Sequence, residues 1–238
     1  MKSKLITLVL LLLTQLSHAS EKLSVLVEDW YPFNYQDGDE IVGSSTDYVK
    51  RLLEHAQLDY EIEIREWSQA FAILKSEPNT LLYSTFKTAK RADMFHWICP
   101  INEPVYSSAY ALTDNTQVTA ATLEQLKAYS VGITQDTYPF HLFKDLGFIE
   151  GENIQVTKNN SSNLGMLLRG RVDVIIESDI AIEGMIDKAK VDPSKIKKLL
   201  AVKDPNHPEI CLAISKQTDQ STVKKLKQAQ QFLKASQG

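Results

Sequence analysis

The chain has 238 residues, of which 43% are hydrophobic and 24% charged, and its formal net charge is −4 at neutral pH. The 30 acidic residues outnumber the 26 basic ones, so no excess of positive charge is available for a phosphate backbone and we expect no nucleic-acid partner. The length exceeds the common size of one domain, roughly 100–150 residues, and predicts either one large α/β unit or two lobes.

Residues 1–19 have the pattern of a cleaved secretory signal. Lys2 and Lys4 precede an apolar run, and the small residues Ser17 and Ala19 follow it. The run is shorter than the ~20 residues of a comfortable membrane span, and no cysteine stands just after Ala19 to take a lipid anchor. We therefore expect cleavage after Ala19 and a periplasmic location for the product.

Strands and helices alternate through the first half of the mature chain. Residues 23–28 and 59–66 predict strands, because β-branched residues or strict alternation fill them. The segment between them predicts an amphipathic helix with Ser45 or Thr46 as its N-cap. A second helix is predicted at 68–76, capped by Ser68, and a further strand at 81–85.

The alternation starts afresh near residue 122 and predicts a second α/β unit. Its expected helices are 122–129, 138–147, 161–170 and 179–190, and its expected strands are 129–134, 153–157, 171–177 and 197–202. One more strand at 210–215 and a closing helix at 221–236 follow, the helix with Val223, Leu226 and Phe232 facing inward.

The last strand and helix are too few to form a domain alone. Residues 110–116 suggest a crossing out of the first unit, and the proline-containing segment 205–210 suggests a crossing back. We therefore predict a discontinuous first lobe, residues 20–112 with 208–238, and a second lobe, residues 113–207. Two strands join the lobes and would act as a hinge.

The two cysteines, Cys99 and Cys211, each lie in a strand-like apolar run. Export to an oxidising compartment permits a disulfide between them, but buried free cysteines would fit the same pattern. The sequence leaves both alternatives open.

Four segments together resemble a known family. They are WYPFNYQDGDEIVGSSTDYVKRLLE (30–54), TAKR (88–91), VGITQDT (131–137) and LLRGRVDVIIES (167–178). In this order, after a signal peptide, they resemble the extracellular solute-binding proteins of family 3, the periplasmic proteins that deliver polar amino acids to ABC transporters. The resemblance implies an α/β, two-lobed periplasmic binding protein fold of type II, a small ligand with a carboxylate, and an inner-membrane permease as partner. We also expect a monomer.

The resemblance also implies ligand-binding residues. The arginine of the T-x-x-R motif, here Arg91, would clamp the ligand carboxylate, because a planar guanidinium offers two parallel donors. Thr88 would cap a helix whose first amides point the same way. Thr137 matches a hydroxyl residue that contacts the same carboxylate at a helix start, although Asp136 or Thr137 could instead merely cap that helix. Trp30 matches an aromatic wall for the ligand side chain.

The sequence departs from the family's pattern at two places. The aspartate that receives a ligand ammonium is replaced by Ser178, so Glu177 or Asp179 would have to supply the carboxylate. Because neighbouring residues of a strand point to opposite faces, we expect Asp179 to matter more than Glu177. Phe86 stands where relatives often carry a small hydroxyl residue, which would narrow the pocket.

Two other functions remain as alternatives to a transport role. The chain could be an orphan or sensory receptor of the same fold, or a periplasmic enzyme resembling cyclohexadienyl dehydratases with Glu177 as the acid or base. Metal-binding spacings, a nucleophile elbow and a phosphate-binding loop are missing from the sequence. We therefore expect no metal, no cofactor and no catalytic residue.

Overall fold

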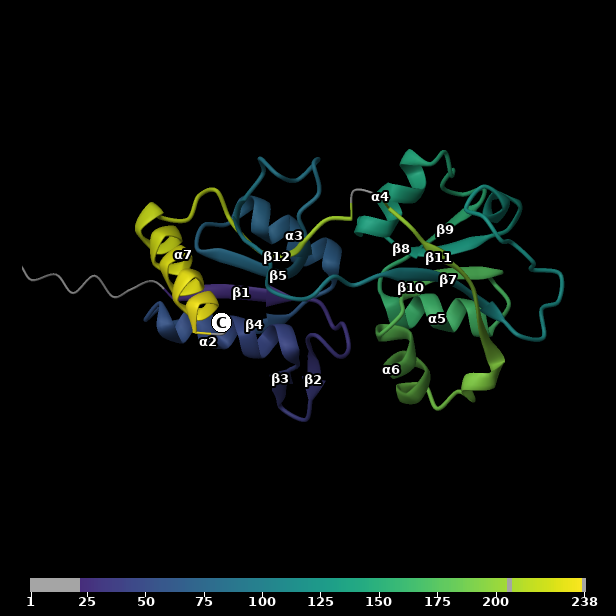
Figure 1. Cartoon of the computed structure of the whole chain (residues 1–238), viewed down its shortest axis with the longest axis horizontal. Coiled ribbons are helices and arrows are strands. Elements are labelled where there is room, and N and C mark those ends of the chain that lie inside the picture. The colour runs from purple at the N-terminus through teal and green to yellow at the C-terminus, as the bar shows by residue number, and fades with distance from the viewer. Residues whose placement is uncertain (1–21, 205–206, 237–238) are drawn as a thin grey trace, which may run out of the picture.

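The computed structural model describes residues 22–204 and 207–236. It is an α/β structure of two lobes, each built around its own five-stranded mixed sheet, and Figure 1 shows the lobes side by side with the chain passing between them. The two-lobed α/β fold expected from the sequence is confirmed. The expected signal, residues 1–19, lies outside the described residues. Within the described part of the chain, no helix combines the length and apolar character that a membrane span needs.

The first lobe contains the sheet β4-β1-β5-β12-β6, a separate β2-β3 hairpin and three helices. β4 and β5 run parallel to β1, whereas β12 is antiparallel to β5 and β6. The strands are β1 (Leu23–Val27), β2 (Tyr35–Asp37), β3 (Glu40–Val42), β4 (Tyr60–Ile64), β5 (Thr80–Phe86), β6 (His96–Ile98) and β12 (Ile210–Ile214). The helices are α2 (Ser44–His55), α3 (Trp67–Ser76) and α7 (Gln220–Ala235).

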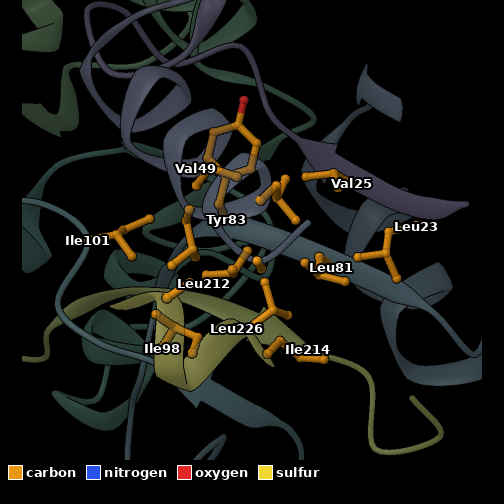
Figure 2. Close-up of a cluster of buried hydrophobic side chains, with 14 of the residues drawn as sticks. Leu23, Val25, Val49, Leu81, Tyr83, Ile98, Ile101, Leu212, Ile214 and Leu226 are labelled. Atoms are coloured by element: carbon orange, nitrogen blue, oxygen red, sulfur yellow. The ribbon is translucent and has the colours of Figure 1, made fainter. Parts of the chain in front are cut away.

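Both faces of this sheet are buried, which explains the nearly continuous apolar character of its central strands. Odd- and even-numbered residues of β1 and β5 pack into two different cores, because strand side chains alternate between faces. Val25 packs with Leu52 of α2 and Leu226 of α7, and Figure 2 shows part of this core. Leu26, on the opposite face, packs with Leu74 of α3.

The second lobe contains the sheet β11-β7-β10-β8-β9. Its strands are β7 (Ser107–Leu112), β8 (Val131–Thr134), β9 (Ile154–Thr157), β10 (Val174–Ser178) and β11 (Ile196–Val202), and its helices are α4 (Tyr138–Asp145), α5 (Asn160–Leu168), α6 (Ala181–Lys188), η1 (Gln125–Ala128) and η2 (Pro193–Lys195). Alternate residues of β10 again serve two cores: Ile176 packs on the α4 side and Ile175 on the α5 and α6 side.

The chain passes between the sheets twice, after β6 and after β11. β12 therefore belongs to the first sheet, although all strands of the second sheet precede it after β6. The lobe limits 20–112, 208–238 and 113–207 remain a proposal. Pairing of β7 with β10 and β11 favours an earlier first limit, ahead of Ser107, than the sequence suggested.

A disulfide joins Cys99, just after β6, to Cys211 in β12, with a Cα–Cα distance of 4.6 Å. The two cysteines are separated by 112 positions in the sequence, and the segment between them includes the whole second sheet, so the bond fastens the outgoing chain to the returning chain at the first lobe. Among the described residues, one group has metal-ligand spacing, namely Cys99, Glu209 and Cys211. The disulfide removes the two thiolates that such a site would use.

Several local expectations differ from the structure. α2 and α3 begin after Gly43 and Glu66 with no side-chain cap, so neither Ser45, Thr46 nor Ser68 is an N-cap. Only the short η1 forms within 122–129. Phe232 of α7 is 55% exposed and stacks on His55 instead of entering the core. The β2-β3 hairpin was not predicted, because each strand has only three residues.

Candidate functional site

A cavity of about 60 Å³ lies between the lobes, at the carboxyl ends of β1 and β5 in the first lobe and of β8 and β10 in the second. Ligands bind α/β proteins at this end of the strands, where the following loops supply side chains and free amides. The lining consists of Glu28, Trp30, Trp67, Ser84, Phe86, Arg91, Ser107, Ile133, Thr134, Thr137, Tyr138, Pro139, Asn160, Ile176, Glu177 and Ser178. Six of the seven residues that the sequence singled out are therefore brought together, and Asp179 is the one that is not.

Arg91 is 4% exposed and presents its guanidinium to the cavity. Its Cζ lies 5.2 Å from the ring centroid of Trp67 and 5.0 Å from that of Phe71, so two aromatic faces hold the group in place. Burial lowers the pKa of Arg91 to about 10, which leaves it charged at neutral pH. In the described part of the chain, no carboxylate forms an ion pair with it. The guanidinium is thus a buried cation without an ion-pair partner among the described residues, although the charge of Asp136 acts on it and opposes the lowering of its pKa.

Arg91 donates hydrogen bonds to two backbone carbonyls. Nη2 reaches the carbonyl oxygen of Asp136 at 2.6 Å, and Nη1 reaches that of Phe86 at 3.4 Å. The chain around Arg91 forms successive turns, with Arg91 N bonded to Thr88 O, and no helix begins at Thr88. The expected contribution of helix amides beside Arg91 is therefore not present there. A guanidinium has five N–H groups, so donors remain for a ligand carboxylate.

Asp136 joins the lobes through its backbone. Its carbonyl oxygen accepts from Arg91 and also from Nε1 of Trp67, at 2.9 Å, and both donors belong to the first lobe. Asp136 has φ of 57°, and Ser84, another residue at the cavity, has φ of 56°. Residues other than glycine adopt this left-handed region at some cost, and such strain gathers at functional sites.

Aromatic rings form the wall over the cavity. The ring centroid of Trp30 lies 4.7 Å from that of Phe33 and 6.1 Å from that of Phe86. The ring centroid of Phe86 lies 5.1 Å from that of Tyr138 in the second lobe. Phe86 therefore lies between a ring of the first lobe and a ring of the second. Thr137 precedes α4 without a side-chain cap bond, and its hydroxyl donates to the carbonyl of Thr134 at 2.7 Å. Neither it nor Asp136 caps the helix with its side chain.

Two acidic side chains face Arg91's cavity from opposite lobes. Glu28 follows β1 and is partly buried, with an Oε1 that is enclosed and has no hydrogen-bond partner. Glu177 in β10 is 5% exposed, and its Oε1 accepts from the backbone N–H of Ser178 at 2.9 Å. Burial raises the pKa of Glu28 to about 8, with the charge of Glu177 adding to the effect. Burial also raises the pKa of Glu177 to about 7, against the opposing Ser178 hydrogen bond.

These two raised pKa values predict that the ligand-free protein loses stability as pH rises. Below about pH 4.5 both carboxyls are protonated whether the chain is folded or unfolded; from there to about pH 8, folding must retain protons that the unfolded chain has released. The expected loss is on the order of a few kcal/mol, since one pKa unit corresponds to about 1.4 kcal/mol. Denaturant unfolding at pH 5, 6, 7 and 8 measures it.

Glu28→Gln should flatten this decline between pH 5 and 8. His96 and His141 have lowered pKa values, chiefly because of burial, and give the opposite slope, so the comparison of variant with wild type isolates the carboxyl contribution. A wild-type decline that Glu28→Gln and Glu177→Gln both leave unchanged would contradict the assignment.

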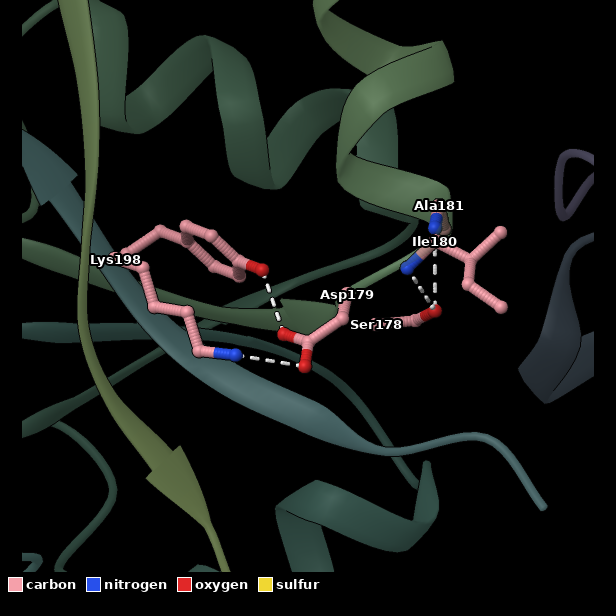
Figure 3. Close-up of polar contacts among 6 residues, drawn as sticks. Ser178, Asp179, Ile180, Ala181 and Lys198 are labelled. Carbon is pink, nitrogen blue, oxygen red and sulfur yellow. Dashed lines mark hydrogen bonds and ion pairs between the residues drawn. The ribbon is translucent and has the colours of Figure 1, made fainter.

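Ser178, the last residue of β10, and Asp179, the first residue after it, make different contacts, which Figure 3 shows. Ser178 lines the cavity, and its Oγ accepts from the backbone N–H groups of Ile180 and Ala181 at the start of α6. Asp179 turns away to the second lobe's own surface, where Tyr110 donates to it at 2.6 Å and Lys198 at 2.8 Å. Burial by itself would raise the pKa of Asp179, but these partners outweigh it and lower the pKa.

The expected priority of Asp179 over Glu177 therefore has no support in this geometry. Strand alternation alone suggested that Glu177 and Ser178 could not both face the cleft, yet both line the cavity at the end of β10. Asp179 is already neutralised by Lys198, so it is not available to a ligand ammonium.

Sequence reasoning missed Glu28 and Trp67. Glu28 is the first residue after β1, and its position at the carboxyl end of a buried parallel strand is the signal that would have found it. Trp67 opens α3, and its role depends on the contact with Asp136 of the other lobe, which no local pattern reveals.

Ion pairs also connect the lobes at the edges of the cleft. Lys90 pairs with Asp145 at 2.7 Å, and Lys188 pairs with Asp29 at 3.2 Å. Exposed pairs of this kind contribute little stability, about 0–1 kcal/mol each. These two ion pairs show that the lobes are in contact at the edges of the cavity.

Comparison with known proteins places these features in context. The model of the bacterial extracellular solute-binding proteins, family 3, matches residues 23–237. The arginine-binding extracellular protein ArtP of Bacillus subtilis (strain 168) is 24% identical over 160 residues, which span 66% of this chain and 60% of that protein.

Solved structures share the fold at low identity. A histidine kinase sensor domain with similarity to periplasmic binding proteins has a TM-score of 0.79 at 18% identity, over 91% of this chain and 92% of that one. An ancestral arginine-binding protein bound to arginine has a TM-score of 0.76 at 17% identity, over 91% and 93% of the two chains. The arginine-, lysine-, histidine-binding protein ArtJ of Geobacillus stearothermophilus has a TM-score of 0.75 at 19% identity, over 91% and 90%. The family match, which covers nearly the whole described chain, is decisive: this protein belongs to the bacterial extracellular solute-binding proteins, family 3.

Proposed function

We propose that this protein binds an amino acid with a cationic side chain in the cavity between its lobes and presents it to an ABC transporter in the inner membrane. The observation that carries the proposal is the set of charged groups in the cavity: one guanidinium, Arg91, and two carboxyls, Glu28 and Glu177. A basic amino acid has the complementary set of one carboxylate and two cations. Its binding would neutralise every one of these buried groups.

A neutral amino acid would satisfy this cavity less well. Its carboxylate would pair with Arg91 and its ammonium with one carboxyl, but the other carboxyl would stay buried without a cation. That group would have to remain protonated, as the raised pKa values of Glu28 and Glu177 indicate for the empty cavity. The names of the relatives, which refer to arginine binding, agree with this preference.

Closure of the two lobes around the ligand would produce the form that the permease recognises. Arg91, Trp30 and Glu28 belong to the first lobe, whereas Glu177 and Thr137 belong to the second, so a ligand contacts all of them only when the lobes are together. A ligand shifts an equilibrium by the difference in its affinity for the two states, so it would favour the closed form. A permease would then distinguish loaded from empty protein by shape.

Thermal shift of the mature protein tests the proposal. The panel contains L-arginine, L-lysine, L-glutamine, succinate and agmatine, the last being arginine without its carboxylate. A ligand at 100 times its dissociation constant adds about 2.7 kcal/mol of stability, so L-arginine or L-lysine should raise the unfolding temperature most. Agmatine should bind weakly because it leaves Arg91 unpaired. Stabilisation by succinate or L-glutamine alone would contradict a basic ligand.

Chemical analysis of L-arginine and of prephenate after incubation with the protein separates binding from turnover. Glu177 is a buried acid with a pKa of about 7, a property that a general acid would also have. We expect L-arginine to be recovered chemically intact after long incubation, and prephenate to be unchanged by the protein. Conversion of prephenate that disappears in Glu177→Gln would favour the dehydratase.

A further inference from the structure

A helix of the second lobe touches the first lobe through a glycine. Gly184 lies inside α6, and the ring of Tyr31, in the loop after β1, rests against its backbone. A methyl group at Gly184 would lie 2.8 Å from Cγ of Tyr31 and closer still to Cδ1 and Cε1. At such distances a side chain at position 184 fits only if α6 moves or the Tyr31 ring, which is 44% exposed, is displaced. Since glycine is a poor helix former, its place within α6 requires a packing reason, and this contact supplies one.

A second contact joins the same two segments. Lys188, one helical turn after Gly184, pairs with Asp29, which stands two residues before Tyr31. The glycine therefore lies beside a charged pair that also crosses between the lobes. Together the two contacts seat α6 on the loop after β1.

The segments that meet here also supply the cavity. The loop carries Glu28 and Trp30 within the three residues before Tyr31, and α6 begins after Ser178 with only two residues between them. Neither segment can shift at this contact without moving the residues that it brings to the cavity.

We propose that Gly184 and Tyr31 form the stop that sets how closely the two lobes approach, with Gly184 as a positioning residue for the ligand cavity. The absent side chain lets the Tyr31 ring lie directly against the backbone of α6, so α6 comes nearer to the first lobe than a residue with a Cβ at position 184 would allow. That approach brings the carboxyl of Glu177, from the second lobe, to the same cavity that Glu28 and Arg91 line from the first lobe. Any side chain at position 184 holds the lobes apart or displaces Tyr31. This inference deepens the proposed function and depends on it for the choice of L-arginine as a probe.

Zero-length carbodiimide cross-linking tests the contact without a ligand. It joins a lysine to a carboxylate only when they touch, and because the bond is irreversible it traps the closed form of the free protein each time the lobes come together. In the wild type, Lys188 should cross-link to Asp29, and Lys22 should cross-link to Glu61, which lies within the first lobe at 3.0 Å. Gly184→Ala should lose most of the Lys188–Asp29 product and keep the Lys22–Glu61 product. Peptide mass spectrometry measures both.

Gly165→Ala is the matched control. Gly165 is also helical, in α5, but a methyl group there meets only the guanidinium end of Arg169, which can move aside. Both substitutions improve helix propensity equally, so both free proteins should unfold at or above the wild-type temperature. Gly165→Ala should retain both cross-links.

Affinity for L-arginine, measured by calorimetry, completes the test as a double-mutant cycle. Gly184→Ala should weaken binding at least tenfold when Tyr31 is present and less than twofold in the Tyr31→Ala background, because the clash then has no partner. Equal losses in both backgrounds, or no loss in either, would overturn the inference.

Failure of the proposed function remains distinguishable from failure of this inference. If L-arginine does not bind the wild type, the ligand assignment fails and the cross-linking result alone decides the role of Gly184. Absence of the Lys188–Asp29 product from the wild type, with the Lys22–Glu61 product present, would overturn the stop. Equal amounts of the Lys188–Asp29 product in Gly184→Ala and the wild type would do so too.

Discussion

Arg91→Ala is expected to weaken binding of L-arginine by about 3–5 kcal/mol, the usual result of leaving a buried charge without its partner. The ligand carboxylate would enter a cavity whose remaining charged lining residues are acidic, and it would face Glu28 and Glu177 without a positive charge to offset them. The variant should stay folded, because in the free protein the cost of burying the guanidinium opposes the contacts that it makes. Calorimetry at pH 7 measures the loss.

Arg91→Lys should recover only part of that affinity. A lysine restores the charge, but it does not offer two parallel donors to a carboxylate, and it stacks less well against the rings of Trp67 and Phe71. Arg51→Ala, at an exposed position of α2, is the control for loss of one arginine. Wild-type affinity in Arg91→Ala would eliminate the carboxylate clamp.

The second large effect is expected from the acidic pair. Glu28→Gln and Glu177→Gln should each weaken binding of L-arginine by roughly 2 kcal/mol or more, since each removes the counter-ion of one buried cation while keeping the shape. Asp179→Asn should change affinity by less than about 0.5 kcal/mol, because Asp179 lies outside the cavity and is paired with Lys198. This order is the reverse of the one that the sequence alone suggested.

The pH profile gives an independent check on the pair. The empty cavity holds protons on Glu28 and Glu177 up to pH 7–8, and a cationic ligand requires the ionised forms. Affinity for L-arginine should therefore rise with pH from 5 to 8 and then level off. Each glutamine variant should show a shallower rise. An affinity that falls over this range in the wild type would mean that the ligand does not pair with these carboxyls.

Most of the architecture could be predicted from local patterns. Apolar runs such as those of β1 and β10 are long enough to fix buried strands, and the 3.6-residue period of α2 and α7 fixes their inner faces. The return of β12 to the first sheet followed from the shortness of the C-terminal tail. Phe232 departed from the prediction because the inner face of α7 runs through Leu226, Ala229 and Leu233, which leaves Phe232 beside that face, where its ring stacks on His55.

The candidate site was predictable only where a motif carried it. Arg91 came from its spacing after Thr88, and Trp30 from its place before a proline. Asp179 is turned away from the cavity toward Lys198 of β11, whereas Ser178 lines the cavity. Lys198 is 19 positions away in the sequence and lies beside Asp179 only after the sheet forms, so the sequence could not reveal this difference. The contact of Gly184 could not be predicted from the sequence, because its partner Tyr31 belongs to the other lobe.

Binding of L-arginine compared with L-citrulline tests the central claim most directly. The two amino acids have nearly the same shape, but the ureido group of citrulline is neutral, so only the second positive charge differs. A cavity with one guanidinium and two carboxyls should bind L-arginine at least a hundredfold more tightly at pH 7.5, or about 2.8 kcal/mol, and the preference should shrink in Glu28→Gln. Equal affinity of the wild type for the two amino acids would contradict recognition of a cationic side chain by this pair of buried carboxyls.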